Sequence, residues 1–153
     1  MITIRFETGT ELTLPLESLS GAELRGLELH RAILAGQDLS GAILCNANLR
    51  AAILDDANLE GADLTDAKMM VATLRRARLG GAILRRAMLN GADLEGADLS
   101  NADLKDADLG GASLRAADVR GADLRASRLD LAKLEDVRHD ERTRWPEGFE
   151  IGR

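Results

Sequence analysis

A five-residue period in leucine dominates the sequence. Steps of five from Leu24 to Leu134 give 23 positions, of which 21 are Leu. The other two positions hold Met69 and Val119. Two residues before each of the 23 positions stands Ala, except in three repeats, which have Leu27, Gln37 and Ser127 there. Most of the 153-residue chain follows this rule, so the fold must give every fifth residue the same environment.

A period of five excludes the regular elements. On an α-helix a step of five turns the side chain by about 140°, which scatters the leucines around the axis. On a β-strand an odd step places successive leucines on opposite faces. The chain is therefore predicted to turn a corner once in every repeat, with Leu and Ala pointing inward. The predicted inward core includes Leu24, Leu44, Leu64, Leu84, Leu104 and Leu124.

The residue two places after each leucine supports this prediction. It is Gly at nine positions, among them Gly61 and Gly91, and Asn or Asp at six more. These residue types adopt the positive φ that a tight corner requires with least strain. The corners are therefore predicted at this position of each repeat.

Runs such as GADLEGADLSNADLKDADLGGASL resemble the A(D/N)LXX motif of pentapeptide-repeat proteins. The resemblance covers residues 22–136. It implies an all-β fold, a right-handed quadrilateral β-helix with four pentapeptides in each coil. The 23 repeats then make nearly six coils, and stacking at sheet spacing gives a rod about 28 Å long.

Both ends depart from the repeat, as the ends of a solenoid must if its last coils are to be covered. We predict one domain with an N-terminal cap at 1–21, the β-helix at 22–136 and a C-terminal cap at 137–153. Alternating apolar residues around Phe6 indicate a β-hairpin in the first cap. Trp145 and Phe149 are predicted to cover the last coil. All three aromatic side chains of the chain thus fall in the caps.

Charge is distributed unevenly along the predicted rod. The chain carries net charge −6, but residues 64–90 contain six basic and one acidic side chain, a net of +5. Residues 20–63 and 91–130 each carry −4. The basic belt consists mainly of Arg75, Arg76, Arg78, Arg85 and Arg86. The belt either contacts an acidic partner or is neutralised by the acidic coils on both sides.

Residues four repeats apart should stack on one face if four repeats make a coil. The column that contains Arg75 and Arg115 alternates in sign with Asp55, Glu95 and Glu135, which predicts a ladder of ion pairs.

The same region breaks the polar pattern of the surface. Met70, Val71 and Met88 are predicted to form a small exposed apolar patch with a basic rim. The alternative is that they are scattered apolar residues of an ordinary surface. The belt and this patch together are the candidate partner surface.

No pattern in the sequence predicts catalysis, and we expect no catalytic, cofactor-binding or metal-binding residues. His30 and His139 have no metal-ligand spacing, and phosphate-binding and nucleophile-elbow motifs are absent. Cys45, expected to be an exposed, ordinary thiol, cannot form an internal disulfide, which favours a cytoplasmic location. No apolar run is long enough to span a membrane.

Two functions follow from these observations. The first is a non-enzymatic, rigid scaffold that binds an unknown protein partner through its outer faces, as a monomer or an end-to-end dimer. Direct binding of nucleic acid is not expected from an acidic chain. The second comes from the resemblance alone: some pentapeptide-repeat proteins mimic DNA, bind DNA gyrase or topoisomerase IV and protect these enzymes from inhibitors.

Overall fold

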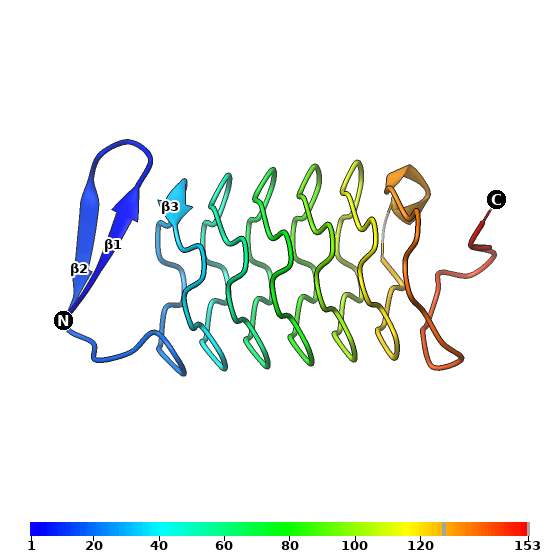
Figure 1. Cartoon of the computed structure of the whole chain (residues 1–153), viewed down its shortest axis with the longest axis horizontal. Coiled ribbons are helices and arrows are strands. Elements are labelled where there is room, and N and C mark those ends of the chain that lie inside the picture. Colours follow the sequence, from blue (N-terminus) through cyan, green and yellow to red (C-terminus); the bar gives the residue numbers. More distant parts are fainter. Residues whose placement is uncertain (127, 153) are drawn as a thin grey trace.

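The protein is a stack of coils between an N-terminal hairpin and a C-terminal tail (Figure 1). The computed structural model describes residues 1–126 and 128–152, so position 127 of the repeat register lies outside the described residues. The elements are β1 (Ile2–Phe6), β2 (Glu11–Leu14), β3 (Ala32–Ile33) and the 3-10 helix η1 (Leu129–Leu131). The remaining repeat backbone forms short parallel bridges between coils rather than long strands.

Each coil consists of four repeats, one on each side. Parallel bridges join Glu23 to Ile43 and Ile43 to Asp63, and equivalent bridges occur on all four sides of the coil. The N–H of Leu44 donates to the carbonyl of Asp63 at 2.7 Å, and the N–H of Ile43 donates to Ala22 at 2.9 Å. Each side is therefore hydrogen-bonded to the coils before and after it, which satisfies its buried backbone groups.

Leucine and alanine fill the interior as the period predicts. From Leu24 to Leu129, the described residues of the leucine register are at most 2% exposed, and Met69 and Val119 are fully buried. Leu134 is only partly buried because it lies in the last coil, next to the open end. Burial of a leucine side chain contributes about 1.5–3 kcal/mol, so this stack is the main source of stability.

The corners lie two residues after the inward leucines. At a typical corner, the N–H of Ala42 donates to Leu39 at 3.0 Å and Gly41 has φ of 63°. Val71 occupies the same kind of position with φ of 52°. A β-branched residue in this region is strained, so Val71 departs from what the backbone prefers.

The four faces of the rod take their names from the inward leucines of the first coil: the Leu24, Leu29, Leu34 and Leu39 faces. On each face, the residues before and after the inward side chain point outward. Residues four repeats apart stack along a face, as the bridge from Lys68 to Met88 shows.

The N-terminal hairpin covers the first coil. β1 pairs with β2 in antiparallel register, with Ile4 opposite Leu12. β1 also pairs with β3, with Phe6 opposite Ala32. Ile4 is 2% exposed and Phe6 packs against the core, so the apolar side of the hairpin closes this end.

The stacking continues beyond residue 136 at the other end. Asp118 bridges to Arg138, which keeps the register of four repeats, but Asp123 bridges to Arg144, one position beyond that register. One extra residue therefore enters this side of the last coil. The ring of Trp145 follows this bridge and stacks on Phe149 at 5.4 Å between centroids, and both rings pack against the core.

We predict that Leu64→Ala lowers the free energy of unfolding by about 2–5 kcal/mol, because Leu64 is fully buried and alanine leaves a cavity. Urea titration followed by circular dichroism measures the change. Leu131→Ala, at a side chain that is 58% exposed, is the control and should cost far less. Equal losses for the two variants would contradict the assigned core.

We predict that substitutions at two equivalent corners differ in their effect on stability. Gly61 has φ of 64° and open space where a Cβ would lie, so Gly61→Val should cost about 1–2 kcal/mol through backbone strain alone. Val71→Gly relieves the same strain and should not destabilise the protein. Thermal unfolding of both variants tests this, and a loss of stability in Val71→Gly would contradict it.

Candidate interaction surface

The belt arginines do not gather on one face. Arg75 lies on the Leu34 face, Arg78 on the Leu39 face and Arg85 on the Leu24 face, while Arg76 and Arg86 lie at corners. The belt therefore encircles the rod. A single flat partner cannot contact all five side chains together.

Each belt arginine is paired with a carboxylate. Arg76 donates two hydrogen bonds of 2.9 Å to Asp56, and Arg86 makes the same two-point contact with Asp66. These hydrogen bonds lower the pKa of both aspartates below the usual value. The other pairs are Arg75 with Glu95 at 3.2 Å, Arg78 with Glu60 at 2.7 Å and Arg85 with Asp103 at 2.6 Å. Neighbouring acidic side chains thus neutralise these five arginines, which was the alternative to contact with an acidic partner.

The alternating column forms the expected contacts at several rungs. The backbone N–H of Arg75 donates to Asp55 at 2.9 Å, and its guanidinium donates to Glu95. Arg115 pairs with Glu135 at 3.0 Å. The column therefore holds coils together and leaves little charge for a ligand.

The apolar residues lie apart from most of the belt. Met88 belongs to the Leu29 face and is 40% exposed; Val71, at its corner, is 53% exposed. Met70, on the same face, is partly buried, and the N–H of Met69 donates to the carbonyl of Met88 in the next coil at 2.8 Å. Of the belt residues, Arg86 lies at the corner that adjoins this face.

Sequence reasoning missed two cations on the Leu29 face, Arg50 and Lys68. Both side chains are exposed, and among the described residues neither has a carboxylate at ion-pair distance. Arg50 lies one coil before Met70, and Lys68 one coil before Met88. Because residues four repeats apart stack, the sequence could have placed Arg50 beside Met70 and Lys68 beside Met88. We call the set of Arg50, Lys68, Met70, Val71 and Met88 the Met70 patch.

Cys45 was expected to be exposed, and this expectation is wrong. The side chain is 9% exposed, and its Sγ lies 4.0 Å from the carbonyl oxygen of Asp63. Burial raises the pKa of the thiol, and the side chain of Asp63 acts in the same direction. The physical reason is the small size of cysteine, which keeps the thiol close to the backbone. Cys45 is therefore a poor nucleophile.

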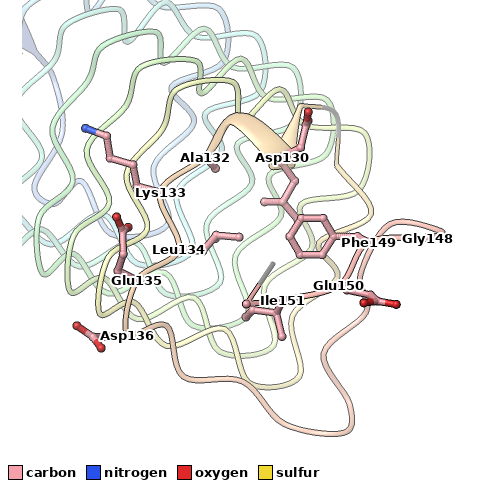
Figure 2. A pocket seen from close by; sticks show the side chains of 12 residues that line it. Asp130, Ala132, Lys133, Leu134, Glu135, Asp136, Gly148, Phe149, Glu150 and Ile151 are labelled. Carbon is pink, nitrogen blue, oxygen red and sulfur yellow. The ribbon is translucent and has the colours of Figure 1, made fainter.

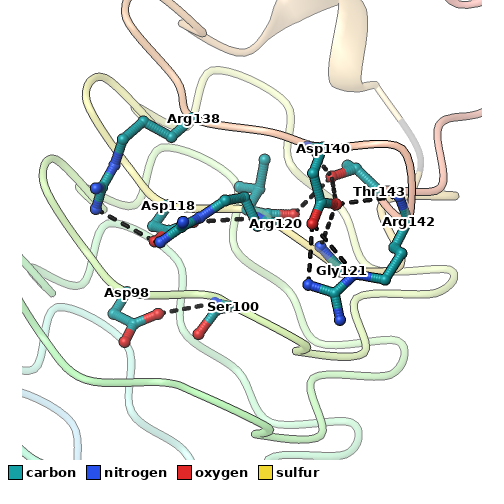
Figure 3. Close-up of polar contacts among 10 residues, drawn as sticks. Asp98, Ser100, Asp118, Arg120, Gly121, Arg138, Asp140, Arg142 and Thr143 are labelled. Atoms are coloured by element: carbon teal, nitrogen blue, oxygen red, sulfur yellow. Dashed lines mark hydrogen bonds and ion pairs between the residues drawn. The ribbon is translucent and has the colours of Figure 1, made fainter.

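The C-terminal end carries a polar network around two buried side chains, Asp118 and Thr143 (Figure 3). Asp118, 5% exposed, pairs with Arg120 at 2.6 Å and with Arg138 at 3.2 Å. Hydrogen bonding by Arg120 lowers the pKa of Asp118. These contacts join the last two coils of the Leu39 face.

Asp140 organises the lengthened side of the last coil. Its carboxylate accepts the N–H of Gly121 at 2.9 Å and both backbone and side-chain donors of Arg142. Burial acts to raise the pKa of Asp140, but these hydrogen bonds outweigh it and lower the pKa to about 2. Thr143, held in the same network, donates to the carbonyl of Val119 at 3.0 Å.

An open groove of about 690 Å³ lies between the last coil and the tail (Figure 2). Its apolar lining comes from Leu129, Leu134, Phe149 and Ile151. Asp130, Asp136 and Glu150 lie among the other lining residues and make this end acidic. A second hollow, of about 390 Å³, lies between β1 and the first coil.

The described residues contain no group of three or more His, Cys, Asp and Glu side chains arranged to hold a metal ion. His30 is exposed, and His139 packs edge-on against Trp145 at 5.7 Å between ring centroids. No helix within residues 1–126 and 128–152 has the length and apolar character needed to cross a membrane.

The model of the pentapeptide repeats matches the chain in eight copies, over residues 32–69, 72–106 and 102–138. The chain belongs to the pentapeptide-repeat family. No curated protein matches the sequence. The residues matched by the family model lie within the stacked coils, so sequence family and fold agree.

Solved structures of pentapeptide-repeat proteins are similar to this chain. Rfr23 from the cyanobacterium Cyanothece 51142 is 25% identical with a TM-score of 0.54, over 82% of this chain and 88% of that one. HetL from the cyanobacterium Nostoc sp. strain PCC 7120, involved in heterocyst differentiation regulation, is 34% identical with a TM-score of 0.40, over 69% of this chain and 48% of HetL. QnrB1, a plasmid-mediated fluoroquinolone resistance protein, is 19% identical with a TM-score of 0.25, over 71% of this chain and 80% of QnrB1.

We predict that Asp140→Asn destabilises the protein at neutral pH and that the difference from wild type shrinks as pH falls from about 4 to 2. The carboxylate of Asp140 has a folded pKa of about 2, below its ordinary 3.8. Its stabilising contribution is therefore present above pH 4 and is lost as the pH drops through 2. Urea unfolding at several pH values measures the difference.

The matched control is Asp130→Asn, at an exposed carboxylate of the same end of the rod. This substitution should change stability little at any pH. A difference between Asp140→Asn and wild type that stays constant from pH 7 to 2 would contradict the assigned role of Asp140.

Proposed function

We propose that the protein is a non-enzymatic, rigid scaffold that binds a protein partner through its outer faces. The observation that carries the proposal is the filled interior: inward residues such as Leu64, Ala67 and Met69 are 0% exposed. A substrate cannot enter such a core. The outer faces and the two ends are the surfaces that remain for recognition. Membership of the pentapeptide-repeat family is consistent with this role.

The shape of the scaffold belongs to the same proposal. The family resemblance implies a right-handed coil with a quadrilateral cross-section, and the four bridged sides of each coil support it. Ion pairs between coils, such as Arg76 with Asp56, stiffen the surface further. We propose that the scaffold acts in the cytoplasm without a cofactor, as a monomer or an end-to-end dimer.

The function is tested by affinity capture from the native host, followed by reconstitution from purified components. We expect at least one captured protein to rebind the purified chain directly. Charge reversal at Arg75, Arg78, Arg85 and Arg86 then tests the belt, with urea unfolding as the control for folding. Full rebinding by a folded belt variant would exclude the belt as the interface, and failure of every captured protein to rebind would contradict the scaffold function.

The DNA-mimic alternative stays a prediction. A mimic of duplex DNA needs a continuous negative surface, whereas arginines interrupt each of the Leu24, Leu34 and Leu39 faces. Supercoiling by purified DNA gyrase, with and without a fluoroquinolone, tests it. Inhibition or protection at micromolar protein would support the alternative, and no effect of the protein would remove it.

A further inference from the structure

The Leu29 face differs from the other three in the charge balance of its centre. On the Leu24, Leu34 and Leu39 faces, arginines of the middle coils are paired with carboxylates, as Arg85 is with Asp103. On the Leu29 face the middle coils present Arg50 and Lys68 with no such partner among the described residues. Among the described residues, Lys105 on the Leu24 face and Lys133 on the Leu34 face also lack an ion pair. The Leu29 face is distinguished because its two unpaired cations, Arg50 and Lys68, lie in successive coils.

Apolar surface lies beside these two cations. Val71 is 53% and Met88 40% exposed, and the flexible side chain of Met88 follows Lys68 in the stack. Methionine adapts its shape to a partner because it is unbranched and polarisable. The Met70 patch thus combines two free cations with an adaptable apolar surface.

Polar side chains that are already hydrogen-bonded to each other bound the patch at both ends. Toward the N-terminus, Asn48 donates to Glu28 at 2.7 Å. Toward the C-terminus, Arg128 donates two hydrogen bonds to Asp108, at 2.8 and 2.6 Å. The complementary surface therefore extends from the coil that holds Asn48 and Arg50 to the coil of Met88, which precedes the Asp108–Arg128 pair.

The patch is small. Arg50 and Met88 lie two coils apart, about 10 Å along the rod, and residues 68–71 extend about 10 Å across it. A standard protein interface buries about 800 Å² on each partner, several times this footprint. The patch suits a short segment of a partner better than a second folded copy of this chain.

We infer that the Met70 patch binds a short acidic segment of a protein partner, one that carries an apolar side chain. Carboxylates of the segment pair with Arg50 and Lys68, and its apolar side chain packs on Val71 and Met88. This inference rests on the scaffold function proposed above and names the face and the partner chemistry. Nucleic acid is disfavoured because the coils on both sides of residues 64–90 carry net charge −4 each.

The probe is a phage-displayed library of short random peptides, selected on the immobilised wild-type protein. Peptides that bind the Lys68→Glu variant are removed first. We expect the selected peptides to be rich in Asp and Glu around an apolar residue. Fluorescence anisotropy of a labelled selected peptide should then show at least tenfold weaker binding to Lys68→Glu and to Met88→Ser, and weaker binding at higher salt.

Matched controls lie on the Leu24 face. Lys105→Glu reverses a partly exposed lysine, and Ile83→Ser removes an apolar side chain that is 38% exposed. Both should leave peptide affinity within twofold of wild type. The inference would be overturned if the Leu24-face variants lost as much peptide affinity as Lys68→Glu and Met88→Ser. It would also be overturned if the selected peptides were basic or if the selection gave no binding peptide. So would a DNA duplex that binds the wild type and loses affinity with Lys68→Glu.

Failure of this inference can be told from failure of the scaffold function. A reconstituted protein partner that binds wild type, Lys68→Glu and Met88→Ser equally removes the Met70 patch but leaves the scaffold function standing. If no captured protein rebinds the purified chain, the scaffold function itself fails.

Discussion

Hydrogen bonds between successive coils are the constraint on which the rest of the structure depends. The N–H of an inward leucine reaches a carbonyl on the same side of the next coil, as in Leu44 to Asp63. This contact repeats only if every side of every coil has the same length. The corner must then fall at the same place in each repeat, even where Val71 has to adopt a positive φ. Strain at single corners is tolerated because the ladder around them is continuous.

The same constraint organises the surface. Side chains of neighbouring coils lie one sheet spacing apart, so charges are close enough to pair from coil to coil. Arg76 with Asp56 and Arg115 with Glu135 use this spacing. Several ion pairs of the surface thus hold neighbouring coils together. Pairing is incomplete at the Met70 patch, and for this reason we propose it as the recognition surface.

The C-terminal end shows what happens when the register changes. One extra residue between Arg138 and Arg144 would leave backbone donors without partners. Asp140 accepts the N–H of Gly121 in their place, and Trp145 with Phe149 covers the apolar interior. The acidic groove of Figure 2 arises at this end because the tail crosses the last coil without stacking on it.

The sequence by itself determined the repeat, the inward leucines and the corners, because a strict period of five excludes helix and strand and requires a corner in every repeat. That residues four repeats apart stack was implied by the resemblance to pentapeptide-repeat proteins. Only the tertiary structure decided which charges pair: Arg78 with Glu60 and Arg85 with Asp103 meet on diagonals that no column predicts. The burial of Cys45 and the absence of an ion-pair partner for Lys68 within the described residues were decided there too. The physical reason is the length of the charged side chains. Each can contact several neighbours in two adjacent coils, whereas the backbone hydrogen bonds allow only one register.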